Sequence, residues 1–452
     1  MEERKMYPLT QAQTLMQFNM MLSYKKQIVN ICTMIYFDAP IDPKLMQKAM
    51  ELGYQRNDVA STRMVKVKGK YMQYFTNEPH EPIEIVDFTG KTQEEYEKTV
   101  QKWCSKPFPH AQCNCQLYVA KLVKEPKGSW AMFQCISHFI CDAYAVMTNT
   151  KDILAIYTAL RNKKPLPAPR PSSLPSYEDD FAYSASDRKQ KDIDFFLNDA
   201  YKTEPHFTSF NGYNEKEYIK GKNYGNSTHI LKVSADKLDL FIPAKLVADA
   251  AKFAEQHRVS PFMMYLTALR CYLMKYNNMQ EDIMITCPTA RRATLNQKNS
   301  SGVMVNGLNF RMILPKETPF TEALKKTQLE INKQFRHLNV STADVVMAMN
   351  KKFKTKIGKG YANTSITFQP YFDLGEVDIP CHFRRLCSGA AAQPLYVTIM
   401  PVDNTGRLLC NYEYVKGVVD PENIKRCHDF MQKFLTAALK NPDASLEKLV
   451  QI

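Results

Sequence analysis

The sequence lacks any apolar run that could cross a membrane as a helix. Its most apolar long stretch, Pro261 to Tyr276, is too short and is interrupted by Arg270. The first residues, MEERKMYPLTQ, contain acidic residues and Pro8, and they lack the apolar segment of a signal peptide. We therefore expect no membrane span and a cytoplasmic location.

Paired cysteines and metal-binding patterns are also missing. The 12 cysteines are scattered along 452 residues without an export signal, so free buried thiols are expected in place of disulfides. Cys113 and Cys115 form a lone C-x-C, and no second Cys/His pair stands at the spacing of a zinc finger. The sequence therefore predicts no metal site.

Fixed-period repeats and low-complexity segments are absent, and the 44% hydrophobic and 23% charged composition is that of a globular protein. A chain of 452 residues is too long for one ordinary hydrophobic core, which predicts two domains. The clearest linker is the Pro- and Ser-rich LPAPRPSSLP at residues 166–175. We expect an N-terminal domain at residues 1–175 and a C-terminal domain at residues 176–452.

The formal net charge of +14 favours an anionic partner, such as a phosphorylated cofactor, an acidic protein or nucleic acid. A solvated, lysine-rich surface explains the same charge equally well. The lysines are dispersed and no nucleic-acid-binding motif is recognisable. We therefore expect no nucleic-acid partner, because that hypothesis depends on charge alone.

Hydrophobic periodicity predicts mixed α and β structure in both halves of the chain. Helices are expected at residues 43–56, 92–104, 143–161, 244–257, 260–276 and 421–440. Strands are expected at residues 116–123, 129–136, 283–287, 303–314, 364–368, 395–402 and 408–415. This pattern, with several antiparallel-looking hairpins, indicates an α+β fold.

The stretch FQCISHFICDAYAV, residues 133–146, places His138 after a predicted strand and Asp142 before a predicted helix. The two residues therefore belong to a strand–loop–helix turn and not to one helical face. Taken alone, this stretch favours a core histidine and an aspartate that caps the helix. Cys141 lies in the apolar part of the motif and is expected to be a packed thiol, not a nucleophile.

Four segments, in order, resemble the condensation-domain family of the chloramphenicol-acetyltransferase-like superfamily. PLTQAQ at residues 8–13 is similar to the family's PLTxxQ, and SHFICDA at 137–143 is similar to its HHxxxDG. EDIMITCPTARR at 281–292 is similar to a later family strand that ends in a Pro and an Arg, and GVMVNGLNFR at 302–311 is similar to GxFVNTLPLR. Because the matches keep the family's order over nearly the whole chain, they favour His138 as a functional residue.

The resemblance implies two chloramphenicol-acetyltransferase-like lobes that meet in a V, each a mixed sheet flanked by helices. It implies an active-site tunnel between the lobes, with His138 near its middle. The implied activity of a stand-alone member is that of an acyltransferase or condensation enzyme, as in nonribosomal peptide synthesis. It would transfer an acyl or aminoacyl group from a thioester to an amine or hydroxyl and form an amide or ester bond.

The resemblance also implies roles for individual residues. His138 would be the base or proton acceptor beside the attacking group, a role that a neutral imidazole fits at cytoplasmic pH. Asp142 would shape the site by pairing with an arginine. Arg292 matches that arginine best, and Arg291 is the alternative.

Two motif positions depart from the family, because Ser137 replaces its first histidine and Ala143 its last glycine. These departures motivate an alternative function, a non-catalytic module that binds or recruits a carrier or partner protein. Asn306 is expected to line the tunnel or to pack at a strand end. Ser365 and Thr367 are possible tunnel-lining residues, on a late strand where some acyltransferase relatives place a hydroxyl near the oxyanion.

No carrier-domain helical bundle surrounds Ser445, which lies in a segment that superficially resembles a phosphopantetheine attachment site. We therefore expect no permanently bound cofactor. The donor would be a phosphopantetheine thioester, on coenzyme A or on a separate acyl or peptidyl carrier protein. The acceptor would be a small-molecule amine or alcohol.

Overall fold

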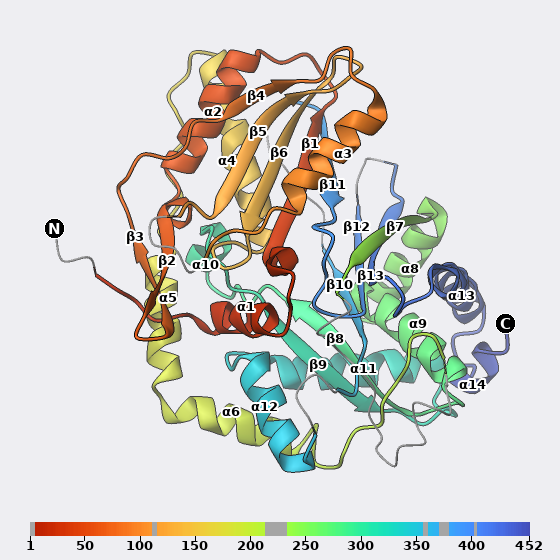
Figure 1. The fold of residues 1–452 in the computed structure, drawn as a ribbon. Coiled ribbons are helices and arrows are strands. Elements are labelled where there is room, and N and C mark those ends of the chain that lie inside the picture. Colours follow the sequence, from red (N-terminus) through yellow and green to blue (C-terminus); the bar gives the residue numbers. More distant parts are fainter. Residues whose placement is uncertain (1–4, 111–114, 213–232, 356–359, 370–378, 402–404) are drawn as a thin grey trace.

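The computed structural model describes residues 5–110, 115–212, 233–355, 360–369, 379–401 and 405–452. It contains a five-stranded and a six-stranded sheet, each covered by helices, which form two lobes of an α+β fold (Figure 1). A separate β-hairpin, β2 (Thr62–Val67) with β3 (Lys70–Phe75), lies beside the first lobe. Within the described residues, no helix combines the length and hydropathy needed to cross a membrane.

The five-stranded sheet of the first lobe has the order β11-β1-β6-β5-β4. Its strands are β1 (Asn30–Phe37), β4 (Glu84–Asp87), β5 (Tyr118–Lys124), β6 (Trp130–Ser137) and β11 (Cys381–Leu386). All neighbours are antiparallel except β4 and β5. Helices α2 (Pro43–Gln55), α3 (Gln93–Cys104) and α4 (Ala143–Arg161) accompany this sheet, and α2 packs against both α4 and β5.

The six-stranded sheet of the second lobe has the order β7-β13-β12-β10-β8-β9. Its strands are β7 (Ala235–Ile242), β8 (Asp282–Thr289), β9 (Asn306–Ile313), β10 (Thr364–Phe368), β12 (Leu395–Pro401) and β13 (Leu408–Val415). Strand β10 runs parallel to β8 and β12, and the other neighbours are antiparallel. The larger hydrophobic core includes residues of α8 (Ala244–Gln256), α9 (Pro261–Tyr276), α11 (Phe320–Phe335) and α13 (Pro421–Lys440) together with this sheet.

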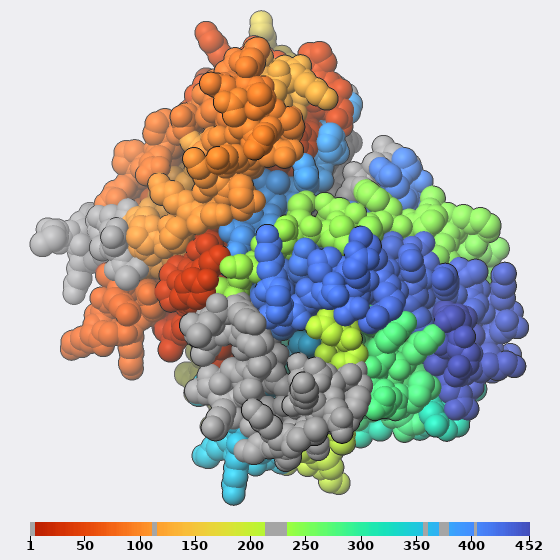
Figure 2. Space-filling model, turned by 45° about the vertical axis from the view of Figure 1, so that its right-hand side comes forward, coloured from red at the N-terminus to blue at the C-terminus, as the bar shows by residue number. Residues whose placement is uncertain are grey.

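Strand β11 connects the lobes, because it follows β10 in sequence but pairs with β1 in the first lobe's sheet. Figure 2 shows light-blue residues between the orange N-terminal mass and the green and dark-blue C-terminal mass. The expected domain ranges, 1–175 and 176–452, stay a prediction, and β11 is a segment of the second range that pairs with the first.

The remaining described elements are helices and short helical turns, several of which lie near the place where the two lobes meet (Figure 1). They are α1 (Gln11–Met21), η1 (Lys26–Val29), η2 (Asp58–Ser61), α5 (Leu174–Ser184), α6 (Asp187–Asn198), α10 (Leu295–Asn299), α12 (Thr342–Phe353) and α14 (Leu446–Leu449). Helix α1 contacts both α12 and β9 of the second lobe. The expected linker at residues 166–175 ends inside the first turn of α5.

Local sequence signals account for the helices that were predicted. Asp42 and Asp420 cap α2 and α13, and a proline follows each cap at the first helical position. Ser260 caps α9 in the same way. All the predicted helices and strands are confirmed, with bounds that shift by a few residues.

Candidate functional site

His138 lies directly after β6, in a loop that leads into α4. Its backbone N–H donates to the carbonyl oxygen of Val29 at 2.7 Å, and Ile140 N–H donates to Ser137 O at 3.0 Å, which fixes the turn. The side chain of His138 is partly exposed. Its Nδ1 is enclosed and has no hydrogen-bond partner among the described residues. The predicted strand–loop–helix placement is confirmed.

The surroundings of His138 favour the neutral imidazole. Burial lowers the pKa of His138 below its ordinary value of 6.5, the Asp142 carboxylate opposes this shift, and the positive charge of Arg385 adds to it. A neutral ring at pH 7 can accept a proton, which is what a general base requires.

Asp142 forms the centre of a buried polar network. One carboxylate oxygen accepts Ala145 N–H at 2.8 Å and caps α4, as the sequence predicted. The other accepts the backbone N–H groups of Met304 at 2.8 Å and Val305 at 3.1 Å, directly before β9. Arg292 Nη2 lies 3.0 Å from both oxygens, and both side chains are only 2% exposed. Asp142 therefore joins the loop of the first lobe to the second lobe.

The two terminal nitrogens of the Arg292 guanidinium make several hydrogen bonds. The guanidinium also donates to the carbonyl oxygens of Gln297, Ser300 and Gly302, at 2.6, 3.1 and 2.6 Å. It lies 4.7 Å from the centre of the Tyr144 ring. The structure thus places the best-matching arginine against Asp142.

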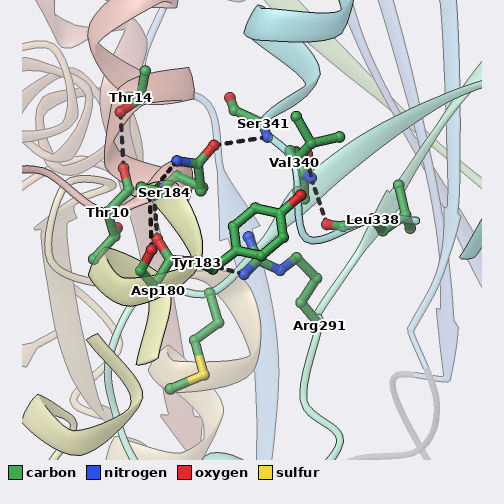
Figure 3. Close-up of polar contacts among 12 residues, drawn as sticks. Thr10, Thr14, Asp180, Tyr183, Ser184, Arg291, Leu338, Val340 and Ser341 are labelled. Carbon is green, nitrogen blue, oxygen red and sulfur yellow. Dashed lines mark hydrogen bonds and ion pairs between the residues drawn. The ribbon is translucent and has the colours of Figure 1, made fainter. Parts of the chain in front are cut away.

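The side chain of the neighbouring Arg291 pairs with a different carboxylate. It binds Asp180 at 2.7 Å, and the same carboxylate accepts Gln11 N–H from α1. Figure 3 shows Asp180, Ser184 and Arg291 gathered beside Thr10 and Ser341, where α1, α5 and the start of α12 meet. This network stabilises the junction of the lobes and does not include His138.

Ser137, which replaces the first histidine of the family motif, has a hydrogen-bond partner that the sequence did not predict. Ser137 Oγ lies 2.7 Å from Nε2 of His110 and accepts Phe139 N–H at 3.3 Å. The ring of His110 also packs against that of Phe139, with centroids 4.9 Å apart. His110 lies 27 residues before Ser137, in a loop without periodicity, so no local pattern could have found this pair.

Acid is expected to destabilise the protein through His110. Burial lowers the pKa of His110 to about 4, from an ordinary value of 6.5, so the unfolded chain binds this proton first. The stabilising contribution is complete above pH 6.5 and is lost as the pH falls toward 4, by up to about 3 kcal/mol. His110→Gln is expected to flatten this part of the pH dependence, measured by urea unfolding between pH 7.5 and 4.5. An unchanged slope in the variant would contradict a buried, neutral His110.

The other motif position that departs from the family, Ala143, is the first residue of α4 and is exposed. It is not among the residues with positive φ, so its backbone needs no glycine. Cys141 is buried, and burial raises the pKa of its thiol, which agrees with the expected packed thiol.

The three predicted tunnel-lining residues differ in their surroundings. The side-chain amide of Asn306 donates to the carbonyl oxygens of Leu338 and Val340, and its oxygen accepts from Thr342, so its contacts fit the packing alternative. Ser365 is buried on β10, and its Oγ has no partner among the described residues. Thr367, two residues along β10, is partly exposed.

Gln13, the last residue of the opening PLTQAQ segment, supports the motif loop directly. Its Nε2 donates to Phe139 O at 2.9 Å and to Gln73 Oε1 at 2.7 Å. Thr10 caps α1 and exchanges hydrogen bonds with Gln13 in a capping box. The segment therefore carries a structural role, and its similarity to a family motif was the signal that could have identified it.

Comparison with known proteins agrees with this architecture. The condensation-domain family model matches residues 3–452. A plipastatin synthase of Bacillus subtilis (strain 168) is 22% identical over 447 residues, and surfactin synthase subunit 1 of the same strain is 21% identical over 455. These alignments cover 98% and 99% of this chain but only 17% and 12% of those proteins.

Solved structures share the fold over 98% of the chain. A mutant of the starter condensation domain of rhizomide synthetase, in complex with C8-CoA and Leu-SNAC, has a TM-score of 0.82 at 16% identity over 96% of its length. The first condensation domain of the calcium-dependent antibiotic synthetase, in complex with a substrate analogue, has a TM-score of 0.80 at 16% identity over 99% of its length. The predicted two-lobed fold and the resemblance are confirmed, and the chain belongs to the condensation-domain family.

Proposed function

We propose that this chain catalyses acyl transfer from a phosphopantetheine thioester to an amine or hydroxyl, with His138 as the proton acceptor. The observation that carries the proposal is the partly exposed His138, whose Nδ1 has no partner among the described residues and whose pKa is lowered by burial. The loop around this ring is fixed by Asp142, Arg292 and Gln13. A fixed imidazole beside two bound reactants is the geometry that such a transfer needs.

In this proposal each residue has a limited task. His138 takes the proton from the attacking amine or hydroxyl while the thioester carbonyl becomes tetrahedral, and the thiolate then leaves with the electron pair of the C–S bond. A thiolate is a good leaving group, so no strong acid is needed. Asp142 and Arg292 hold the loop and neutralise one another, and neither exchanges the reacting proton.

The donor would be coenzyme A or a carrier protein, and both are anionic, in agreement with the net charge of +14. The rhizomide synthetase domain noted above was solved with C8-CoA, which supports coenzyme A as the probe to use first. The tunnel between the lobes, the cytoplasmic location and the choice between coenzyme A and a carrier stay predictions.

The alternative, a non-catalytic recruiting module, was motivated by Ser137 and Ala143. Ser137 makes specific contacts with His110 and Phe139, and Ala143 is exposed at the start of α4. Neither residue displaces His138 or breaks the bond between Asp142 and Arg292. These contacts therefore favour the enzyme over the module.

A transfer assay distinguishes the two functions. The chain is incubated with octanoyl-coenzyme A or octanoyl-pantetheine and a panel of amines, amino-acid thioesters and alcohols, and products are followed by mass spectrometry. We expect an amide or ester whose formation depends on the protein. Saturable binding of the donor without product from any acceptor would favour the recruiting module and overturn acyl transfer.

A further inference from the structure

The six-stranded sheet has two chemically different faces. Residues in register on neighbouring strands project to the same face of a sheet. One such row is Leu238, Tyr412, Val397 and Ile366, which pack into the helix-covered core. The next row along the strands is polar on all six strands: Lys237, Glu413, Tyr396, Ser365, Thr286 and Asn309.

This polar face is partly exposed. Ile366, Val397 and Tyr412, on the helix side, are 0% exposed, whereas Tyr396 and Asn309, on the polar side, are partly exposed. A further polar row follows on the same side, formed by Asp239, Asn411, Thr398 and Thr367. Packing helices on a face with hydroxyl, amide and charged groups would cost free energy, because these groups would be buried without water.

Most groups on the polar face are paired. Arg385 of β11 donates to Thr398 Oγ1 at 3.0 Å and binds Glu413 at 3.1 Å. Thr286 Oγ1 donates to Asn309 at 2.9 Å and accepts Gln393 Nε2 at 3.3 Å. These contacts fix the side chains that surround the middle of the face.

Two buried atoms at that place are not paired within the described part of the chain. Ser365 Oγ has no hydrogen-bond partner, and Ser365 is 1% exposed. Gln393 Oε1 also has none, although its Nε2 binds Thr286, which is in register with Ser365. Leaving buried polar atoms unpaired costs free energy, so both are candidates for contact with a ligand.

The two atoms have complementary hydrogen-bonding capacities. The Ser365 hydroxyl can donate, and the Gln393 carbonyl can only accept. A secondary amide offers the matching pair, a carbonyl oxygen that accepts and an N–H that donates. Both groups are uncharged, so a carboxylate, phosphate or ammonium would fit this pair less well.

The face lies near the His138 loop. Asp142 binds the backbone of Met304 and Val305, and Asn309 follows four residues later, about 13 Å along an extended strand. On the other side, Arg385 both lowers the pKa of His138 and bonds to the polar face. The polar face and the His138 loop are therefore connected through β9 on one side and Arg385 on the other.

We propose that Ser365 and Gln393 form a subsite that binds a secondary amide of the substrate. The inference builds on the proposed acyl transfer and specifies its substrate class. The amide has two possible sources with the same chemistry, the thiol arm of a pantetheine donor or an amide within the acyl group.

Equilibrium binding tests this subsite without requiring turnover. Unreactive thioethers are titrated calorimetrically into the full chain: one carries a single amide in its thiol arm, and another carries a single amide in its alkyl chain. Each is compared with its E-alkene isostere, which keeps the planar shape without donor or acceptor. The variants are Ser365→Ala and Gln393→Leu. The control is Thr267→Val, which removes from α9 another buried hydroxyl that has no partner in the described structure.

We expect Ser365→Ala and Gln393→Leu each to weaken binding of an amide probe about tenfold and to leave its isostere unchanged. Loss confined to the arm probe would assign the pantetheine source, and loss confined to the chain probe would assign the acyl source. Absence of binding, equal losses for amide and isostere, or the same loss in Thr267→Val would overturn the subsite. Intact, amide-dependent binding without any turnover would keep the subsite and count only against acyl transfer.

Discussion

His138→Ala is expected to lower kcat/KM for acyl transfer by about 100- to 10,000-fold, the range that general-base catalysis contributes. The free energy of unfolding should change little, because the side chain is partly exposed and its Nδ1 has no hydrogen-bond partner among the described residues. Turnover of a thioester donor and urea unfolding of the same preparation measure the two effects.

A matched control is His428→Gln. His428 also has a lowered pKa, but it is buried, and its ring binds Tyr412 and the carbonyl oxygen of Phe241 inside the second lobe. This variant should lose stability and keep its turnover per folded molecule, the reverse of His138→Ala. Equal turnover in His138→Ala and the unaltered protein would remove His138 from the mechanism.

The pH dependence of turnover also distinguishes a proton-accepting His138 from one with only a structural role. Because the pKa of His138 is lowered, the neutral, proton-accepting ring persists below the pH at which an ordinary histidine is half protonated. We expect kcat/KM to fall only on acidification below about pH 6.5, the ordinary histidine pKa. The residual activity of His138→Ala should lack this step.

Local signals in the sequence were sufficient to predict those elements whose structure depends on residues close along the chain. The apolar run before His138 and the capping aspartate after it define a strand–loop–helix turn within a few residues. The same holds for α9 and α13, whose first turns carry a capping residue followed by proline. Such features depend on contacts a few residues apart, which a sequence displays directly.

Contacts between distant residues could not be obtained in this way. Strand β11 pairs with β1, which lies far away in the sequence. His382 of β11 also bonds to Asp38, which directly follows β1 and is 344 positions away. Arg385 belongs to β11, and no local pattern in the sequence shows that its charge acts on His138 or that its side chain bonds to the polar sheet face. His110 escaped notice for the same reason. Arg292 was found because a family motif marks it, not because of its spacing.

Asp142→Ala is expected to lower the free energy of unfolding by about 3–5 kcal/mol, because it leaves the Arg292 guanidinium buried without its counter-charge. The same change removes the cap of α4 and the acceptor for two backbone N–H groups before β9. Arg292→Met should cost a similar amount, since it leaves the carboxylate unpaired. Urea unfolding at pH 7 measures each loss.

The double variant separates a pair interaction from two independent losses. If Asp142 and Arg292 stabilise the loop together, the double variant should be more stable than the sum of the single losses predicts, by about 0.5–3 kcal/mol. Asp180→Ala is the comparison, because its pair with Arg291 is somewhat less buried and does not contact the His138 loop. Asp142→Ala should therefore reduce turnover per folded molecule more than Asp180→Ala does. Strict additivity, or full turnover in Asp142→Ala, would show that this ion pair does not position His138.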